Sequence, residues 1–217
     1  MSVTLTSLIL QVRQRANMEG SGFIDDTVEL PAYINASAAE LYDVLVSRFE
    51  DYYSTSLPVT IATGNTAPLP ADFYKLVGLD LFVGGYTVTV HPFNFIERNK
   101  FNRPIQRPRF SPVRYRIMGQ NLLLTPPDLA PGSYTIWYVP RFTNLVLGTD
   151  TLDTLQNWTD YVVVDAAIKC LVKEESDVSV LLMEKAALLK RIESMAANRD
   201  AGEPLTVSDV SGDWGNY

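Results

Sequence analysis

The residue types that most often carry out chemistry are scarce in this sequence. Its 217 residues include one histidine, His91, and one cysteine, Cys170. A Ser-His-Asp or Cys-His arrangement would have to use His91, which ends a predicted strand next to Pro92. Cys170 falls on the apolar side of a predicted helix and has no neighbour typical of a reactive thiol. We therefore interpret His91 as structural or solvent-facing and Cys170 as a small buried hydrophobic residue.

Metal, phosphate and carboxylate chemistry are also poorly supported. One histidine and one cysteine are too few for a zinc site of the usual type. The pairs Gly84-Gly85 and Gly20-x-Gly22 lack the lysine and the strand-to-helix context of a phosphate-binding loop. Asp25-Asp26 and Glu174-Glu175 fall at predicted helix ends, where capping explains them. A hydrolase built on two carboxylates that meet in space remains an alternative. We predict no catalytic residue, no metal and no cofactor.

The composition and net charge argue against several classes of protein. The formal net charge of −7 argues against a general attraction to nucleic acid or to anionic membranes. No apolar run approaches the ~20 residues that a membrane-spanning helix needs. The start, MSVTLTSLILQVRQRA, lacks the basic region and cleavage site of a secretory signal. A lone cysteine allows no intrachain disulfide and fits synthesis in a reducing cytoplasm.

Helical periodicity occurs near both ends of the chain. Leu5, Leu8 and Val12 are spaced as on one helix face. In the third predicted helix, Asp165 interrupts the apolar stripe, so we expect it at the rim or paired, with Lys169 as the natural partner. The predicted helices span residues 3–16, 27–49, 155–173 and 178–198. The apolar face of the fourth comprises Leu181, Leu182, Leu188, Leu189, Ile192 and Met195.

Between residues 52 and 142 the pattern changes to short strands separated by glycine and proline. Gly84-Gly85 and Gly119-Gln120-Asn121 are hairpin signals. Many short strands with such turns predict a small antiparallel barrel or sandwich. The predicted strands are Leu57–Ala62, Leu76–Val83, Tyr86–Val90, Tyr115–Met118, Leu122–Leu124 and Ser133–Val139.

The expected fold class is α+β, with a bundle of about four helices and an inserted β-rich unit. We expect the two helical hairpins to pack on each other. The expected divisions are a helical hairpin at 1–51, a β-rich insertion at 52–142, a second helical hairpin at 143–199, and an extended C-terminal tail at 200–217.

A basic stretch stands out in this net-acidic chain. It contains Arg98, Lys100, Arg103, Arg107, Arg109, Arg114 and Arg116. Three prolines within it favour an extended loop. It could contact an acidic protein surface, bind a phosphate backbone, or be a solvated loop that neutralises nearby carboxylates. We favour the protein contact and take Arg98, Lys100, Arg103, Arg107 and Arg109 as interface candidates.

The C-terminal tail combines acidic and large apolar residues. Simple disorder is the ordinary interpretation of such an end. The apolar residues favour docking on a partner instead, because aromatic side chains are common anchors. The interface candidates here are Leu205, Val207, Val210, Trp214 and Tyr217.

Four stretches together resemble the head-to-tail adaptor (connector) proteins of tailed bacteriophages. YINASAAELYDVLV is similar to their second helix, and WTDYVVVDAAIKCLVKEESDVSVLLMEKAALLKRIESMAANRDAGEP to their C-terminal helices. LPADFYKLVGLDL and YRIMGQNLLLTPPDLAPGSYTIWYVPRFTNL are similar to the β-rich segment of the larger adaptors.

The resemblance implies a non-enzymatic structural protein of the virion, made in the host cytoplasm and located at the neck between head and tail. It implies a ring of subunits, usually twelve, that binds the portal protein and docks the next tail or neck protein. Packaged DNA would pass through without specific binding, which suits a net negative charge, and no membrane would be involved. The C-terminal segment would reach into the portal or an adjacent subunit. Another neck or tail-completion protein, or a nucleic-acid-binding module using residues 98–116, remain the alternatives.

Overall fold

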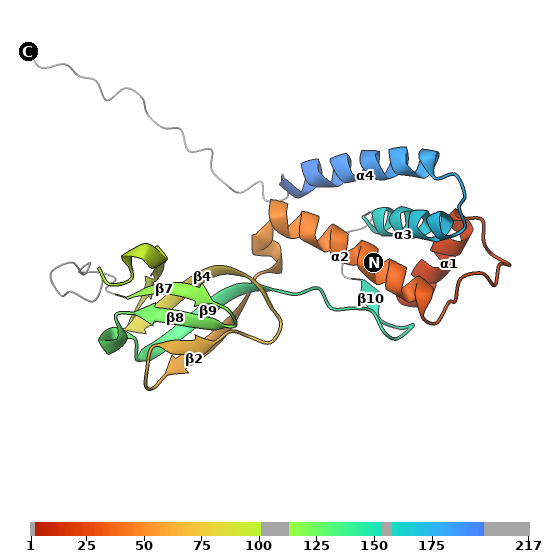
Figure 1. Ribbon diagram of the computed structural model, residues 1–217. Helices are drawn as coiled ribbons and strands as arrows, with labels where there is room; N and C mark the ends of the chain where they lie inside the picture. Colours follow the sequence, from red (N-terminus) through yellow and green to blue (C-terminus); the bar gives the residue numbers. More distant parts are fainter. Residues whose placement is uncertain (1–2, 101–112, 153–157, 198–217) are drawn as a thin grey trace, which may run out of the picture.

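The computed structural model describes residues 3–100, 113–152 and 158–197, which form a helical body and a β body (Figure 1). The β body lies at one end of the helical body, beyond the C-terminal end of α2 (Figure 1). The helical body contains α1 (Leu5–Arg15), α2 (Glu29–Arg48), α3 (Thr159–Lys173) and α4 (Ser179–Ala197). The predicted α+β class is confirmed. None of the described helices is long and apolar enough to cross a membrane.

The helices begin and end close to the predicted positions. The Thr4 side chain accepts a hydrogen bond from the Ser7 N–H at 3.3 Å and so caps α1. The expectation that Asp25 or Asp26 caps the second helix is wrong, because α2 starts at Glu29 with no side-chain cap. Asp25 instead accepts a bond from the Thr27 N–H at 2.6 Å, and Asp26 pairs with Arg13 at 2.6 Å.

All four helices contribute to one buried core. Its largest fully buried side chains are aliphatic, as expected for helices that each turn one apolar face inward. On α4, however, Leu182 and Met195 are exposed, so the predicted apolar face of that helix was too broad. The core includes Leu8, Val12, Leu30, Ile34, Leu41, Val162, Cys170 and Ile192.

A short β-ladder joins the start of the chain to the segment that returns from the β body. β1 (Val3–Thr4) pairs antiparallel with β10 (Thr151–Leu152). The same returning segment is fixed to α2 by Asn35, whose Nδ2 donates to the Leu145 carbonyl at 2.9 Å and whose Oδ1 accepts the Leu145 N–H at 2.8 Å. This pairing was not predicted from the sequence.

The β body contains two four-stranded sheets that share one core. Leu79, Leu81 and Ile136 from one sheet are buried together with Leu122 and Leu124 from the other. Of the two predicted arrangements, the structure therefore matches the sandwich and not a closed barrel. One sheet has the order β2 (Thr55–Ile61), β9 (Gly132–Pro140), β4 (Phe73–Val83), β5 (Tyr86–Thr89); the other has β3 (Thr66–Pro68), β8 (Asn121–Thr125), β7 (Arg114–Met118), β6 (His91–Pro92).

Both glycine hairpins form as predicted. Val83 pairs with Tyr86 across Gly84 and Gly85, whose φ values are +60° and +87°. Met118 pairs with Asn121, and Gly119 has a φ of +60°. Such left-handed backbone favours glycine, which is why the sequence signal was strong. The sheets are not wholly antiparallel, because β6 and β7 pair in parallel.

Tyr42 connects the two bodies. Its hydroxyl donates to the Pro140 carbonyl at 2.6 Å, and its ring packs edge-on against Tyr53 with centroids 4.9 Å apart. Phe142 lies against the same ring at 6.0 Å. A short 3-10 turn at Glu50–Tyr53 (η1) follows α2, and Tyr53 packs against the helical core. Two further 3-10 turns lie in the β body, at Phe95–Glu97 (η2) and Pro127–Leu129 (η4).

Candidate interaction surfaces

The two residues that could have carried nucleophilic chemistry belong to different bodies. His91 is exposed in β6, whereas Cys170 is buried in α3 within the helical core. Burial raises the pKa of the Cys170 thiol to about 11, so it is not an activated nucleophile at neutral pH. Within residues 3–100, 113–152 and 158–197, no group of three or more His, Cys, Asp or Glu side chains is placed to hold a metal ion.

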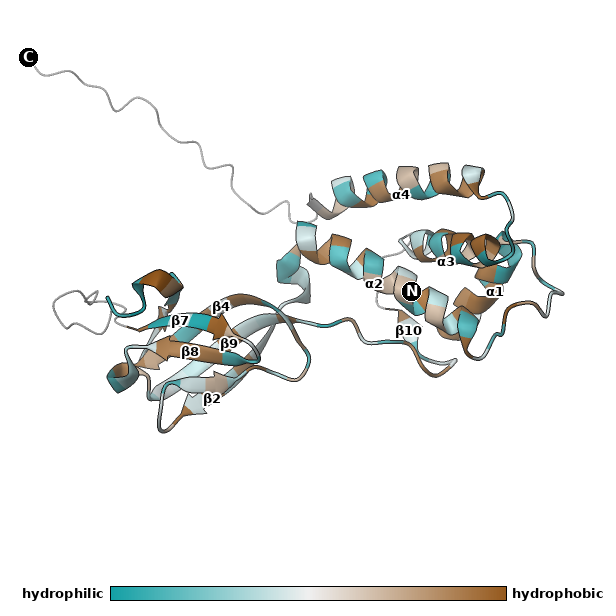
Figure 2. Ribbon diagram, viewed as in Figure 1, coloured by the Kyte–Doolittle hydropathy of each residue, from teal (hydrophilic) through white to brown (hydrophobic). Residues whose placement is uncertain are grey.

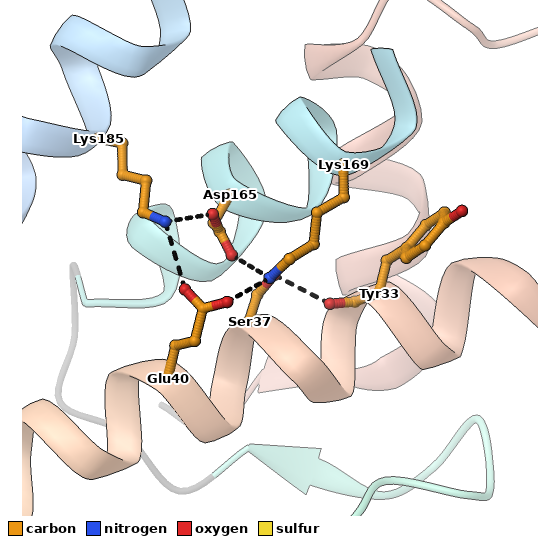
Figure 3. Close-up of polar contacts among 6 residues, drawn as sticks. All are labelled: Tyr33, Ser37, Glu40, Asp165, Lys169 and Lys185. Carbon is orange, nitrogen blue, oxygen red and sulfur yellow. Dashed lines mark hydrogen bonds and ion pairs between the residues drawn. The ribbon is translucent and has the colours of Figure 1, made fainter. Parts of the chain in front are cut away.

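A buried ion-pair network links three helices (Figure 3). The Asp165 carboxylate accepts hydrogen bonds from Lys169 on its own helix and from Lys185 of α4, the latter at 2.6 Å. Lys169 also donates to Glu40 of α2 at 2.8 Å, and Lys185 reaches the other Glu40 oxygen at 3.3 Å. The Ser37 hydroxyl accepts from Lys169 at 2.9 Å and donates to the Tyr33 carbonyl at 2.9 Å (Figure 3).

Electrostatics in this network favour the charged forms. Burial by itself would raise the pKa of Asp165, but hydrogen bonds from Lys169 and Lys185 outweigh it, so that pKa is lowered. Burial would lower the pKa of Lys185, but the bond to Asp165 outweighs it and the pKa is raised. The Asp165 carboxylate therefore binds two ammonium groups, and the same two lysines connect α3 and α4 to Glu40 of α2.

The pair of Asp165 with Lys169 was predicted from the sequence, whereas the contacts with Lys185 and Glu40 were not. Four-residue spacing on one helix reveals a pair, whereas Lys185 and Glu40 lie on other helices and carry no local signal. The role of the network is therefore structural: it ties α2, α3 and α4 together.

The described part of the basic stretch makes local contacts on the surface of the β body. The exposed Arg98 lies over the Phe95 ring, 5.0 Å from its centroid, and donates to the Phe95 carbonyl at 3.2 Å. Lys100 forms an ion pair with Glu97 at 3.4 Å, and Arg116 donates to the Phe93 carbonyl at 3.1 Å. Figure 2 shows β7, which carries Arg114 and Arg116, as hydrophilic beside the hydrophobic β8.

The other predicted interface residues lie outside the described residues. These are Arg103, Arg107 and Arg109 of the basic stretch and Leu205, Val207, Val210, Trp214 and Tyr217 of the tail. The structure therefore brings Arg98 and Lys100 to one region and does not test the rest of the set.

Several hollows border the helical side of the molecule. One of about 220 Å³ lies at the junction of the two bodies, among Leu41, Tyr42, Leu45, Pro140 and Phe142. A narrower one lies inside the helical core beside Cys170. A wider groove of about 560 Å³ runs between α2 and the segment 144–146. Apolar lining of this kind suits packing against protein better than binding a charged small molecule.

A family model described as SU10 adaptor protein matches residues 3–208. The molecule is thus of the class of phage adaptor proteins, which are structural parts of the virion. Because the match spans nearly all of the 217 residues, the chain belongs to the SU10 adaptor protein family. The predicted resemblance to head-to-tail adaptors is confirmed. A search among curated proteins found no match.

Proposed function

We propose that this chain is a head-to-tail adaptor that forms a ring below the portal, extends the DNA channel and docks the next tail component. The observation that carries the proposal is the adaptor-family match over residues 3–208. A role without catalysis follows from this family and agrees with the inert surroundings of Cys170. Synthesis in the host cytoplasm precedes assembly in this proposal.

Ring formation requires two different surfaces on each subunit, because a heterologous contact closes only when one surface meets another under a fixed rotation. The portal, a second copy of the chain and the next neck or tail protein are the proposed partners, with twelve as the expected ring number. The net charge of −7 suits a channel through which DNA moves without being bound.

The experiment is a phage in which this gene carries a nonsense mutation. We expect DNA-filled heads without tails, together with free tails, and complementation by the wild-type chain. Electron microscopy of complemented particles should show the chain as a ring between portal and tail. Particles that have normal tails without the chain would contradict the proposal. Location further down the tail would instead favour a tail-completion protein.

The basic stretch and the tail are proposed contact segments of this adaptor. Arg98, Lys100, Arg103, Arg107 and Arg109 would meet an acidic protein surface, and residues 204–217 would dock on the portal or a neighbouring subunit. Deleting 204–217 should leave the monomer folded, by circular dichroism, and reduce its retention on portal rings. Charge reversal at Arg103, Arg107 and Arg109 should impair assembly. Wild-type retention and assembly would remove these segments from the interface.

A further inference from the structure

The outer side of α4 carries exposed apolar residues followed by a basic residue. α4 packs on the bundle through Ile192 and Ala196, which are buried. On the opposite side Val180 is 67% exposed and Met183 is 70% exposed. The exposed Lys190 continues this row two turns further on. These exposed apolar side chains are available for contact with another protein.

α2, by contrast, borders a hollow. Its lining includes small residues of α2, among them Ala32, Ala36 and Ala39, and the hollow measures about 560 Å³. Val28 and Val146 also line it and are 67% and 78% exposed. The segment 144–146 is held beside α2 by the two hydrogen bonds between Asn35 and Leu145. The exposed Asp43 lies one turn beyond Ala39 on the same helix.

These two surfaces lie on different sides of the helical body. α4 packs against the side of α2 that carries Ser37 and Glu40 through the ion-pair network, whereas the groove opens toward the segment 144–146. In Figure 1, α4 lies above α2, and the segment leading into β10 lies below it. The two helices run in the same direction (Figure 1), so a neighbour related by a small rotation would present α4 nearly parallel to α2.

We propose that the occupant of the α2 groove is α4 of a second copy of this chain, and that this is the repeating contact of the ring. The inference rests on the ring proposed above. Met183 and Lys190 are seven residues apart, as are Ala36 and Asp43. Parallel packing therefore places the Met183 thioether over Ala36 and the Lys190 ammonium beside Asp43 in a single register. A methionine side chain is flexible enough to fill a hollow lined by alanine residues. The pair of opposite charges would fix the register.

Cross-linking tests the register directly. The variant Ala36→Cys with Met183→Cys, in a Cys170→Ala background, is incorporated into phage particles and oxidised. We expect a ladder of covalent multimers up to the full ring on a denaturing gel. The matched control joins Ala36→Cys to Thr87→Cys, an exposed position in β5 of the other body, and should give no ladder.

Charge exchange tests the polar end of the contact. Lys190→Asp and Asp43→Lys should each lower incorporation into particles by about tenfold or more, and the double variant should recover most of it. Asp43 also accepts a hydrogen bond from the Tyr74 hydroxyl at 2.8 Å, so circular dichroism must show each variant to be folded. If Asp43→Lys does not fold, Lys190→Asp and the cross-link still decide the matter.

The outcomes separate the two proposals. Rings seen by electron microscopy that neither cross-link nor respond to Lys190→Asp would overturn this contact and leave the proposed function standing. If wild-type particles contain no ring of this chain, the proposed function fails and the contact fails with it.

Discussion

Among the residues that the structure describes, Asp165 is the one charged residue that is buried. Replacing it by asparagine keeps the shape and removes the charge, which leaves Lys169 and Lys185 with the half-exposed Glu40 as their only carboxylate partner in this network. We expect Asp165→Asn to lower the free energy of unfolding by about 3 kcal/mol, the low end for a broken buried pair, since the lysines retain partial contact with water. Chemical denaturation measures this.

Glu40→Gln is the matched control for that experiment. Glu40 contacts the same two lysines, but its side chain is 47% exposed. Water screens its charge, and we expect a loss of less than about 1 kcal/mol. Equal losses for the two variants would show that burial of Asp165 does not set the energy of the network.

The same residue sets a pH dependence. The pKa of Asp165 is lowered from 3.8, so its stabilising effect is present above that pH and is lost as the pH falls through the folded-state pKa. The pKa of Lys185 is raised from 10.5, so its effect is present below that pH and is lost as the pH rises further. The difference in unfolding free energy between wild type and Asp165→Asn should be constant between these limits and shrink outside them. A difference that shrinks near pH 7 would contradict this assignment.

Among the elements, the hairpin of β4 and β5 depends on its turn. Gly85 has a φ of +87°, and a Cβ there would meet open space, so any cost of a side chain comes from the backbone alone. We expect Gly85→Ala to destabilise the hairpin by about 1–2 kcal/mol. Hydrogen exchange of the amides in residues 80–89 reports this loss.

Gly20→Ala serves as the control for the hairpin. Gly20 also faces open space but lies outside the left-handed region. Its replacement should change stability by less than about 0.5 kcal/mol. Similar exchange rates for both variants would mean that the turn does not hold the hairpin.

Local signals explain which elements could be predicted. The period of α1 and the glycine turns after Val83 and Met118 are short-range features, so helices and hairpins were found near their true positions. β1 and β10 pair across most of the chain and each has two residues, too few for a pattern. The exposure of Leu182 depends on where α3 and α2 pack, which periodicity within α4 does not reveal.

For the site, the basic and tail residues were chosen by composition, and only Arg98 and Lys100 of that set fall within the described residues. The α2 groove arises because the distant segment 144–146 returns beside the helix, so its shape could not be read from α2 alone.

At the scale of the whole molecule, the two bodies have separate hydrophobic cores. We propose that they are domains divided at residues 51, 142 and 199, with Tyr42 setting their relative orientation. Tyr42→Ala removes its ring contacts with Tyr53 and Phe142 and its bond to Pro140. We expect a loss of about 2–3 kcal/mol, below that of a fully buried aromatic residue, and a broader distance distribution in small-angle scattering.

Tyr42→Phe is the control, since it removes only the hydrogen bond to the Pro140 carbonyl. We expect a loss of about 1 kcal/mol with an unchanged scattering profile. If Tyr42→Ala also leaves the profile unchanged, other residues at the junction hold the orientation.

The insertion of the β body between α2 and α3 has a consequence during synthesis on the ribosome. α2 ends at Arg48 and α3 begins at Thr159, so about 110 residues are translated before α3 and α4 can cover their part of α2. At bacterial translation speeds this takes on the order of 10 s. During that interval the nascent N-terminal helices expose hydrophobic surface that is prone to aggregation, while the β body can already fold. Slow codons within α3 or α4 would prolong this exposure and lower the yield of soluble protein.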